Sequence, residues 1–565
     1  MGDMDVSDFF YVALYFGALI ALTPLLGQWL AVTMKGEPPQ ILRWLGPVER
    51  ALYRFAGICP DREMSWPRYA VALVWFNLLG CALIFALQFW QGHFPLNPQG
   101  FAAPPTGLAV NTAVSFLTNT NWQAYSGEAS LSYFTQMAGL GVQNFLSAAT
   151  GLAVMAALAR GLSRKSSRAI GNFWADIVRP TVYLLVPLSF AFAVVMVAQG
   201  VVMSFAPYVH AFPLAGGEQV IPLGPAASQI AIKQLGTNGG GFFGANSAHP
   251  FENPTALSNF LQSLAILVLP AACVYAYGVL IGARRHARIL FGVMLVFFAG
   301  ALALSLWSEY ASPGSAAMAL EGKELRFGIT PSVIWANATT VASNGSINAM
   351  HSSLSPLAGG IALFNILLGE IIFGGIGSGM YGMAMVILLA VFLAGLMVGR
   401  TPEYLGKKIE AFEIRMAATA VLLPCAVVLL GCAASFATDT GRAAAGNPGP
   451  HALTETLYAW GSMANNNGSA FGSLTATAGL YTWGGAIAML LGRFGVILPV
   501  LAIAGRLAAK KTIPPSNGTF PTDGILFAVL LTGVILTVTA LTYFPALTLG
   551  PVLEHLLLTG GRTFP

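Results

Sequence analysis

The sequence predicts an all-α membrane protein in which about ten transmembrane helices frame four re-entrant polar loops. Three observations support this fold class: the composition, a series of long apolar segments, and four short polar loops between those segments. The chain has 565 residues, of which 56% are hydrophobic and only 9% are charged. Soluble domains carry roughly 25% charged residues. The composition therefore places the chain in a bilayer and excludes a large soluble catalytic domain.

Ten apolar segments are each long enough for a transmembrane helix, which needs about 20 residues. Their approximate limits are 9–32, 68–90, 131–158, 174–203, 256–282, 289–307, 360–398, 416–436, 477–503 and 523–545. The first segment has no basic region before it and no small-residue cleavage site after it. We therefore interpret it as a retained span rather than a signal peptide.

The basic residues predict how these segments are oriented. Most of the 27 Lys and Arg residues fall in the links between spans 1 and 2, 3 and 4, 5 and 6, 7 and 8, or near the link between spans 9 and 10, where we count Arg493. The opposite side carries only Lys233, Lys323, Arg326, Arg442 and Arg562. Because cytoplasmic loops are enriched in Lys and Arg, we expect both termini and all four polar loops to face outside. The net charge of +5 then reflects this bias rather than nucleic-acid binding.

The seventh segment, 360–398, is too long for one straight helix. At 1.5 Å per residue it would measure about 58 Å, against a hydrocarbon core of about 30 Å. Two complete spans would reverse the charge pattern, whereas one interrupted span preserves it. Glycines between 369 and 382 supply the interruption, so we expect a flexible segment, about 374–382, beneath the pore. The alternative is an unbroken helix face of small residues that packs tightly against its neighbours.

Each polar loop centres on a triplet that follows a short apolar stretch. The four triplets are Asn119-Thr120-Asn121, Thr237-Asn238-Gly239, Ser343-Asn344-Gly345 and Asn466-Asn467-Gly468. The preceding stretches, 107–117, 225–235, 331–342 and 453–464, are only about ten residues long and cannot span a bilayer. We expect each to be a pore helix that points its carboxyl end, the negative end of the helix dipole, towards the membrane centre.

The third residue of each triplet favours a turn with positive φ. Gly239, Gly345 and Gly468 adopt such a backbone without a Cβ penalty, and Asn121 is among the few other residue types tolerated there. The backbone leaving each pore helix can then aim its carbonyl oxygens at a common axis. Four such loops would enclose one dehydrated alkali cation. Because the triplets contain no Asp or Glu, they suit a monovalent ion better than a divalent one.

The four loops divide the chain into four repeats of helix, pore loop and helix around a pseudo-fourfold pore, with one extra helix at each end. The predicted boundaries are 1–67 for the N-terminal extra helix and cytoplasmic loop, 68–173 for repeat 1, 174–288 for repeat 2, 289–415 for repeat 3 with its broken second helix, 416–511 for repeat 4, and 512–565 for the C-terminal extra helix.

Four further residues are candidates for separate roles. Gln123 lies just beyond the first triplet, where its amide could add an ion ligand, hold a carbonyl in place or only pack the loop. Glu370 lies inside a span, where ionisable groups are costly and usually functional. It could attract cations into an inner vestibule or pair with a buried donor. Arg400 follows the broken helix as a basic anchor, with a gating or subunit-contact role as the alternative. We expect Lys233 to snorkel to the outer surface.

The candidate site residues form two groups, a filter and a gate or vestibule beneath it. The filter group contains Asn119, Thr120, Asn121, Gln123, Thr237, Asn238, Gly239, Ser343, Asn344, Gly345, Asn466, Asn467 and Gly468. The gate or vestibule group contains Glu370, Gly374, Gly375, Gly377, Gly379 and Arg400.

The residues around the triplets resemble a known family. The segments 118–123, 237–243, 343–346 and 465–469 are similar to the four filter segments of the potassium-binding A subunits of Kdp-type potassium-transporting ATPases. The resemblance covers essentially the whole chain. It implies the fold of the potassium-transporter superfamily, a place in the bacterial inner membrane, and K+ as the bound and transported ion with no other cofactor.

The resemblance also implies partners within the lipid bilayer. These are a P-type ATPase catalytic subunit, a periplasm-facing accessory subunit and a small single-span subunit, with no nucleic acid. The chain itself contains neither an Asp-Lys-Thr-Gly phosphorylation motif nor a G-x-x-x-x-G-K-[ST] phosphate loop. We therefore expect no catalytic residues here and ATP hydrolysis in the partner subunit.

Two other classes of function compete with this interpretation. A self-sufficient potassium channel or symporter of the same superfamily would share the filter and differ in its energy source. A multi-pass membrane enzyme is disfavoured because His, Asp and Glu are sparse in the spans. The five cysteines also form no C-x-x-C pair, so a disulfide framework or a transition-metal site is not expected.

Overall fold

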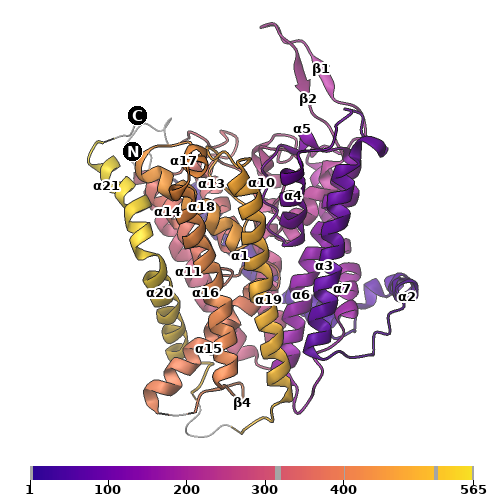
Figure 1. Cartoon of the computed structure of the whole chain (residues 1–565), viewed down its shortest axis with the longest axis vertical. Helices are drawn as coiled ribbons and strands as arrows, with labels where there is room; N and C mark the ends of the chain where they lie inside the picture. The colour runs from indigo at the N-terminus through magenta and orange to yellow at the C-terminus, as the bar shows by residue number, and fades with distance from the viewer. Residues whose placement is uncertain (1–3, 312–319, 400, 515–519, 563–565) are drawn as a thin grey trace.

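The computed structural model describes residues 4–311, 320–399, 401–514 and 520–562, which fold into a bundle of helices (Figure 1). Ten helical segments within these residues are long and apolar enough to cross a membrane, which confirms the predicted number. They are formed by α1 (Val6–Met34), α3 (Trp66–Phe89), α6 (Val142–Ser163), α7 (Phe173–Pro180) with α8 (Val186–Ala198), α10 (Ala256–Leu280), α11 (Arg284–Ala311), α15 (Ser378–Val398), α16 (Ala411–Ala437), α19 (Gly485–Ala509), and α20 (Ile525–Leu547) with α21 (Leu553–Thr559).

The remaining elements are short. π-Helical turns lead into α6, α8, α19 and α21 at Thr135–Gly141, Thr181–Leu185, Leu480–Gly484 and Thr548–Val552. Three surface helices are α2 (Gly46–Phe55), α5 (Gly127–Ser130) and α17 (Asp439–Ala444). Two antiparallel hairpins pair β1 (Val209–Ala211) with β2 (Gln219–Ile221) and β3 (Glu403–Tyr404) with β4 (Lys407–Lys408).

Four short helices occupy the positions predicted for pore helices. They are α4 (Thr106–Leu117), α9 (Ala226–Leu235), α13 (Ile329–Val341) and α18 (Gly449–Ala464). Each lies between two spans in the sequence and ends just before a triplet. Helix α18 begins earlier than the predicted residue 453, because Pro450 in its first turn pre-sets the backbone angle that a helix start requires. The all-α pore-loop architecture is thus confirmed, while the exact repeat boundaries stay predictions.

The inner wall of the bundle is built from the spans that follow the pore loops. Most residues of α6, α10, α15 and α19 are buried, whereas most residues of α1, α3 and α20 are not. Small residues let the inner helices approach closely. A Cβ added at Gly161 of α6 would lie 2.6 Å from the carbonyl oxygen of Ala504 in α19. The inner spans therefore form a rigid frame around the four triplets.

The seventh span is broken, as the sequence predicts. Helix α14 (Pro356–Leu367) ends inside the protein, and α15 starts only at Ser378. The intervening residues 368–377 contain three glycines with positive φ, Gly369, Gly374 and Gly377. The predicted position of the break, 374–382, is wrong at its second half. Gly379 and Gly382 lie in α15, because the backbone needs its left-handed glycines before the helix restarts.

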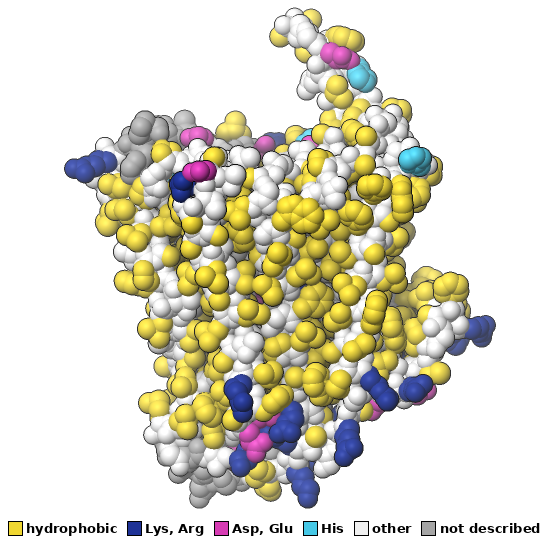
Figure 2. Space-filling model, viewed as in Figure 1, with side chains coloured by type: hydrophobic (Ala, Val, Ile, Leu, Met, Phe, Trp, Pro, Cys, Tyr) yellow, Lys and Arg dark blue, Asp and Glu magenta, His cyan; other side chains and the backbone are white. Residues whose placement is uncertain are grey.

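The basic side chains and the chain ends lie at opposite ends of the molecule. The N and C marks share the end from which the β1–β2 hairpin projects (Figure 1). On the face seen in Figure 2, Lys and Arg side chains gather mainly at the other end, with a broad hydrophobic surface between. This separation agrees with the sidedness that the sequence predicts, and the hydrophobic belt suits a bilayer.

Candidate functional site: a ring of four pore loops

The four triplets meet in a closed ring, and we number them loops 1 to 4 in chain order. A side-chain amide joins the loop of one repeat to the loop or pore helix of its neighbour all the way round, including loop 4 to loop 1. These four hydrogen bonds are donated by Asn119 Nδ2 to Thr237 O (2.9 Å), by Asn344 Nδ2 to Lys233 O (3.1 Å), by Asn467 Nδ2 to Thr339 O (2.9 Å), and by Asn466 Nδ2 to Thr120 Oγ1 (2.8 Å). The common axis that the fourfold repeat predicts is therefore present.

The loops are in direct contact around this axis. Each third-residue glycine packs against the middle carbonyl of the following loop, so that no Cβ fits between them. An added Cβ would lie 1.9 Å from Asn344 O at Gly239, 2.2 Å from Asn467 O at Gly345, and 2.1 Å from Thr120 O at Gly468. The glycines are thus required twice, for their backbone angles and for this contact.

The sign of φ alternates along the backbone of each triplet. The third residues have positive φ as predicted: Asn121 (51°), Gly239 (78°), Gly345 (91°) and Gly468 (102°). The first residues also have positive φ, which the sequence did not indicate: Asn119 (63°), Thr237 (50°), Ser343 (47°) and Asn466 (51°). This alternation turns successive N–H groups to the same side.

The N–H groups of the middle and third residues are tied back to a single residue of the preceding pore helix. These anchor residues are Ser115, Lys233, Thr339 and Ser462. The bonds are donated by Thr120 N and Asn121 N to Ser115 O (3.0 and 3.1 Å), by Asn238 N and Gly239 N to Lys233 O (2.8 and 3.0 Å), by Asn344 N to Thr339 O (3.0 Å) and Gly345 N to Thr339 Oγ1 (2.9 Å), and by Asn467 N to Ser462 O (2.8 Å) and Gly468 N to Ser462 Oγ (2.9 Å). In all four repeats the N–H groups of the middle and third residues are thus engaged. Two of the triplet carbonyls, Thr237 O and Gly239 O, also accept side-chain hydrogen bonds from Asn119 and Asn246.

Gln123 joins loops 1 and 2 outside the ring. Its Nε2 donates to Gly241 O (3.0 Å), and its Oε1 accepts from Gly241 N (2.8 Å). Both ends of the amide are therefore engaged with the backbone of one residue, Gly241. This geometry is compatible with two of the three predicted roles, holding a carbonyl in place and packing the loop, and the role of Gln123 stays a prediction.

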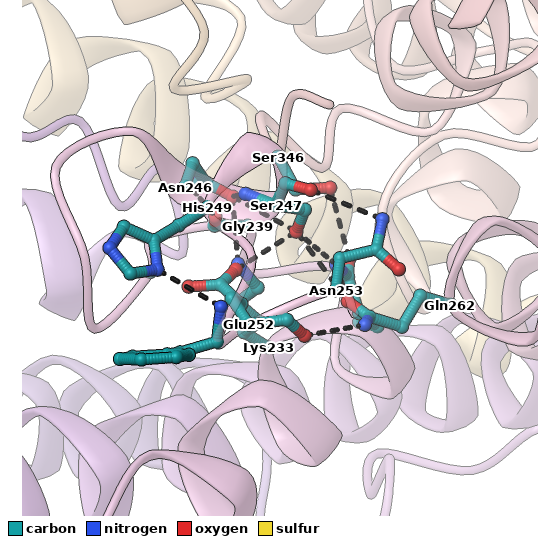
Figure 3. A network of polar contacts seen from close by, with 12 residues as sticks. Lys233, Gly239, Asn246, Ser247, His249, Glu252, Asn253, Gln262 and Ser346 are labelled. Atoms are coloured by element: carbon teal, nitrogen blue, oxygen red, sulfur yellow. Dashed lines mark hydrogen bonds and ion pairs between the residues drawn. The ribbon is translucent and has the colours of Figure 1, made fainter. Parts of the chain in front are cut away.

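Lys233 does not snorkel to the surface, so that prediction is wrong. Its side chain is fully buried, donates to Asn246 Oδ1 (2.7 Å) and forms an ion pair with the equally buried Glu252 (Figure 3). The cause is the segment 246–253, which folds over the end of α9 and closes the route to water. Sequence reasoning missed Glu252, although a lysine in a short pore helix could have prompted a search for an acidic partner nearby.

A second buried charge lies beneath loop 4. Arg493 is not a surface residue of the basic side, as we expected, but lies within α19, where its Nη2 donates to Ser147 O (3.2 Å). Arg493 and Glu370 line one cavity of about 80 Å³ together with Asn466. Within the described residues, Glu370 Oε2 has no hydrogen-bond partner.

The broken segment of the seventh span touches the ring from below. Ile376 N donates to Thr237 Oγ1 (2.9 Å), and a Cβ at Gly375 would lie 3.4 Å from the same oxygen. Of the predicted gate group, Gly375 is thus close to loop 2, whereas Gly374 N donates to Val341 O at the end of α13 (3.1 Å) and Gly377 packs against Gly151 of α6. Gly379 belongs to the first turn of α15. Arg400 lies outside the described residues.

Above the ring, a cavity of about 750 Å³ opens between the loops. Asn121, Gln123, Gly345 and Gly468 are among its lining residues. The ring therefore lies between a wide cavity on the side of the chain ends and a much smaller one below, which is the arrangement that a selective constriction requires.

The fold and the ring define a multi-pass membrane protein with a pore-loop transporter fold. The solved potassium transporter TrkH from Vibrio parahaemolyticus shares this fold with a TM-score of 0.51 at 15% sequence identity, over 84% of this chain and 97% of that one. Residues 13–556 match the family described as the potassium-transporting ATPase A subunit, and the chain belongs to that family.

The curated relatives agree along their whole length. The potassium-transporting ATPase potassium-binding subunit of Sorangium cellulosum (strain So ce56) is 55% identical, over 98% of this chain and 100% of the relative. The protein of the same name from Pseudomonas fluorescens (strain Pf0-1) is 52% identical, over 98% of this chain and 99% of the relative. The resemblance stated from the filter segments is therefore confirmed.

Proposed function

We propose that this chain binds and selects K+ at the outer face of a bacterial inner membrane and passes it into the membrane domain of an ATP-driven, high-affinity uptake complex. The observation that carries the proposal is the ring of four loops whose N–H groups are tied back to the pore helices. The names of the relatives, potassium-binding subunits of a potassium-transporting ATPase, support the choice of ion and of complex.

The chemistry of the ring accounts for ion selection. With the N–H groups engaged, the main-chain oxygens of the four triplets can replace the hydration shell of an alkali cation. Two of these oxygens, Thr237 O and Gly239 O, also accept a side-chain hydrogen bond that fixes their direction. Four pore helices end at the ring, and the negative ends of their dipoles favour a cation there. Because the triplets contain no carboxylate, the ion meets neutral dipoles, which suits a monovalent ion that must also leave.

The residues beneath the ring suit the next step of transport. An ion that leaves loop 4 would enter the cavity lined by Glu370, whose carboxylate attracts cations, while Arg493 in the same cavity opposes a second ion. The broken segment borders this region and contacts Thr237 directly. It is therefore the natural place for a gate between filter and exit.

The energy for uptake comes from other subunits in this proposal. The chain has no phosphorylation motif or phosphate loop, so a P-type ATPase catalytic subunit would hydrolyse ATP. A periplasm-facing accessory subunit and a small single-span subunit would complete the complex. The alternative, a self-sufficient channel or symporter, shares the ring but needs no such partner.

Uptake measurements separate the two alternatives. In cells that lack other potassium uptake systems, we expect the chain to support growth at low K+ only when the ATPase subunit is produced with it. In proteoliposomes, the purified complex should accumulate 86Rb+ only with ATP. Accumulation by the chain alone, driven by an ion gradient, would refute the proposal and favour the self-sufficient transporter.

The predicted orientation is tested by cysteine labelling. Leu214 lies fully exposed in the turn of the β1–β2 hairpin, and the native Cys59 is exposed before α3, on the side predicted to be cytoplasmic. In spheroplasts, we expect a membrane-impermeant maleimide to label Leu214→Cys at once. In a control variant that keeps only Cys59, labelling should require opening of the membrane. The reverse order would show that the termini and loops face the cytoplasm.

A further inference from the structure

The four anchor residues at the ends of the pore helices are equivalent in position but not in chemistry. Three of them, Ser115, Thr339 and Ser462, carry a short hydroxyl that also bonds to the backbone of the loop. The three bonds are from Ser115 Oγ to Trp122 O (2.9 Å), from Gly345 N to Thr339 Oγ1 (2.9 Å), and from Gly468 N to Ser462 Oγ (2.9 Å). In repeat 2 the anchor is Lys233, whose side chain cannot make this local bond.

Lys233 instead reaches loop 2 from the outer side through Asn246. Its ammonium group donates to Asn246 Oδ1 (2.7 Å), and Asn246 Nδ2 in turn donates to Gly239 O (2.8 Å) (Figure 3). Glu252 pairs with the ammonium group on the other side. Glu252, Lys233 and Asn246 thus form a chain of polar contacts that ends at the Gly239 carbonyl, and we call these three residues the relay.

The surroundings of the relay are rigid. Ser247 Oγ donates to Glu252 Oε1 (2.9 Å), and Gln262 Nε2 of α10 donates to Glu252 O (2.9 Å). The His249 ring stacks on Phe243 with centroids 4.0 Å apart. Burial, with a smaller effect of Arg326, lowers the pKa of His249. The neutral ring can then accept the hydrogen bond from Phe251 N at Nδ1 (3.1 Å), which keeps the turn in shape.

The relay makes the ring asymmetric. Within the described residues, a side chain donates a hydrogen bond to the third-residue carbonyl in loop 2 but in none of the other three loops. A carbonyl that already accepts a hydrogen bond on one of its two lone pairs is fixed in direction and can still face an ion with the other. The ion therefore meets three free oxygens and one held oxygen at this level.

The opposite charges of Lys233 and Glu252 act together on the electrostatic potential at loop 2. A buried lysine beside the filter would repel a cation, and Glu252 cancels that field locally. A Cβ at Gly241 would lie 3.0 Å from Glu252 Oε2 and 3.1 Å from Lys233 Nζ, so the pair also touches the peptide that Gln123 holds. Both the geometry and the potential at loop 2 then depend on the same three side chains.

We propose that Lys233, Glu252 and Asn246 are positioning residues that fix the Gly239 carbonyl and thereby set how strictly the filter discriminates K+ from other alkali ions. This inference rests on the proposed function of the ring as a K+ filter. None of the three side chains needs to touch the ion, because each acts through the next.

The test uses the whole purified complex with two variants. Asn246→Ala removes the bond to Gly239 O but leaves the ion pair, whereas Lys233→Met combined with Glu252→Gln removes both charges without leaving one unpaired. We expect each variant to raise the K+ concentration for half-maximal ATPase activity at least tenfold and to reduce K+ over Rb+ and K+ over Na+ preference at least fivefold. The maximal rate at saturating K+ should stay within about twofold.

A matched control removes a different ion pair, between the buried Asp176 and the partly buried Arg160. The two side chains pair at 2.5 Å near the ends of α6 and α7 that are predicted to be cytoplasmic. Arg160→Met with Asp176→Asn should lower the melting temperature without changing ion preference, because it lies away from the ring.

Ion preference and assembly of the two relay variants decide whether the inference holds. Unchanged ion preference in either relay variant that assembles would overturn the inference. Failure of both to assemble would also overturn it, because the relay would then serve folding. Loss of K+-dependent activity in the wild-type complex would instead refute the proposed function, so the two failures are distinguishable.

Discussion

Replacement of Gly239 by alanine is expected to weaken K+ binding at least tenfold, which corresponds to about 1.4 kcal/mol. The new Cβ would lie 1.9 Å from Asn344 O and 2.5 Å from Ser346 N. Both atoms belong to the backbone of loop 3 and its flank, so the middle carbonyl of that loop must move. A larger effect is expected for Gly239→Asp or Gly345→Asp, because each adds a charge next to a ring of neutral oxygens.

Gly399 provides a control for this prediction. It has a positive φ of 69° with ψ of 30°, in the left-handed region, but an added Cβ would have no neighbour within 4 Å. Gly399→Ala thus carries the left-handed strain of about 1–2 kcal/mol without the contact. The K+ concentration for half-maximal ATPase activity, measured with Na+ as competitor, should change in Gly239→Ala only. Equal behaviour of the two variants would show that crowding at the ring does not govern ion binding.

The sequence predicted those parts of the fold and site that depend on local properties. Span number follows from apolar length, and the ends of α4, α9 and α13 follow from the loss of apolar character before each triplet. Positive φ at the third positions follows from glycine and asparagine preference. All of these signals lie within a few residues of the feature that they predict.

The sequence did not predict features that depend on distant partners. Lys233 and Arg493 look like surface charges in the sequence, because nothing near them indicates that the segment 246–253 or the cavity beside Glu370 will enclose them. The positive φ of Thr237 runs against the preference of a β-branched residue. It is imposed by the ring, where Thr237 O accepts from Asn119 and Thr237 Oγ1 accepts from Ile376 N.

The functional roles of the filter and gate residues stay predictions, and the broken span offers the sharpest test of the gate. Gly379→Ala is expected to abolish most transport. An added Cβ would lie 1.4 Å from Phe373 O and 2.3 Å from Phe373 C, distances at which the break and the first turn of α15 cannot both keep their positions. Overpacking of this kind costs about 1–3 kcal/mol or more. We expect a melting temperature lower by several degrees and a transport rate reduced more than tenfold.

Gly300 in α11 is the control, because an added Cβ there meets no atom within 4 Å. Gly300→Ala should leave uptake unchanged and slightly stabilise the helix, by up to about 1 kcal/mol.

A measurement of equilibrium K+ binding to Gly379→Ala separates an effect on the filter from an effect on the gate. Ile376 N contacts loop 2 through its hydrogen bond to Thr237 Oγ1. If the broken segment shifts and only blocks the exit, K+ affinity should stay within about threefold. If its shift also displaces loop 2, K+ binding should weaken as in Gly239→Ala. Wild-type uptake and melting temperature in Gly379→Ala would contradict the close packing of Phe373 on this glycine and, with it, the gate assigned to the broken segment.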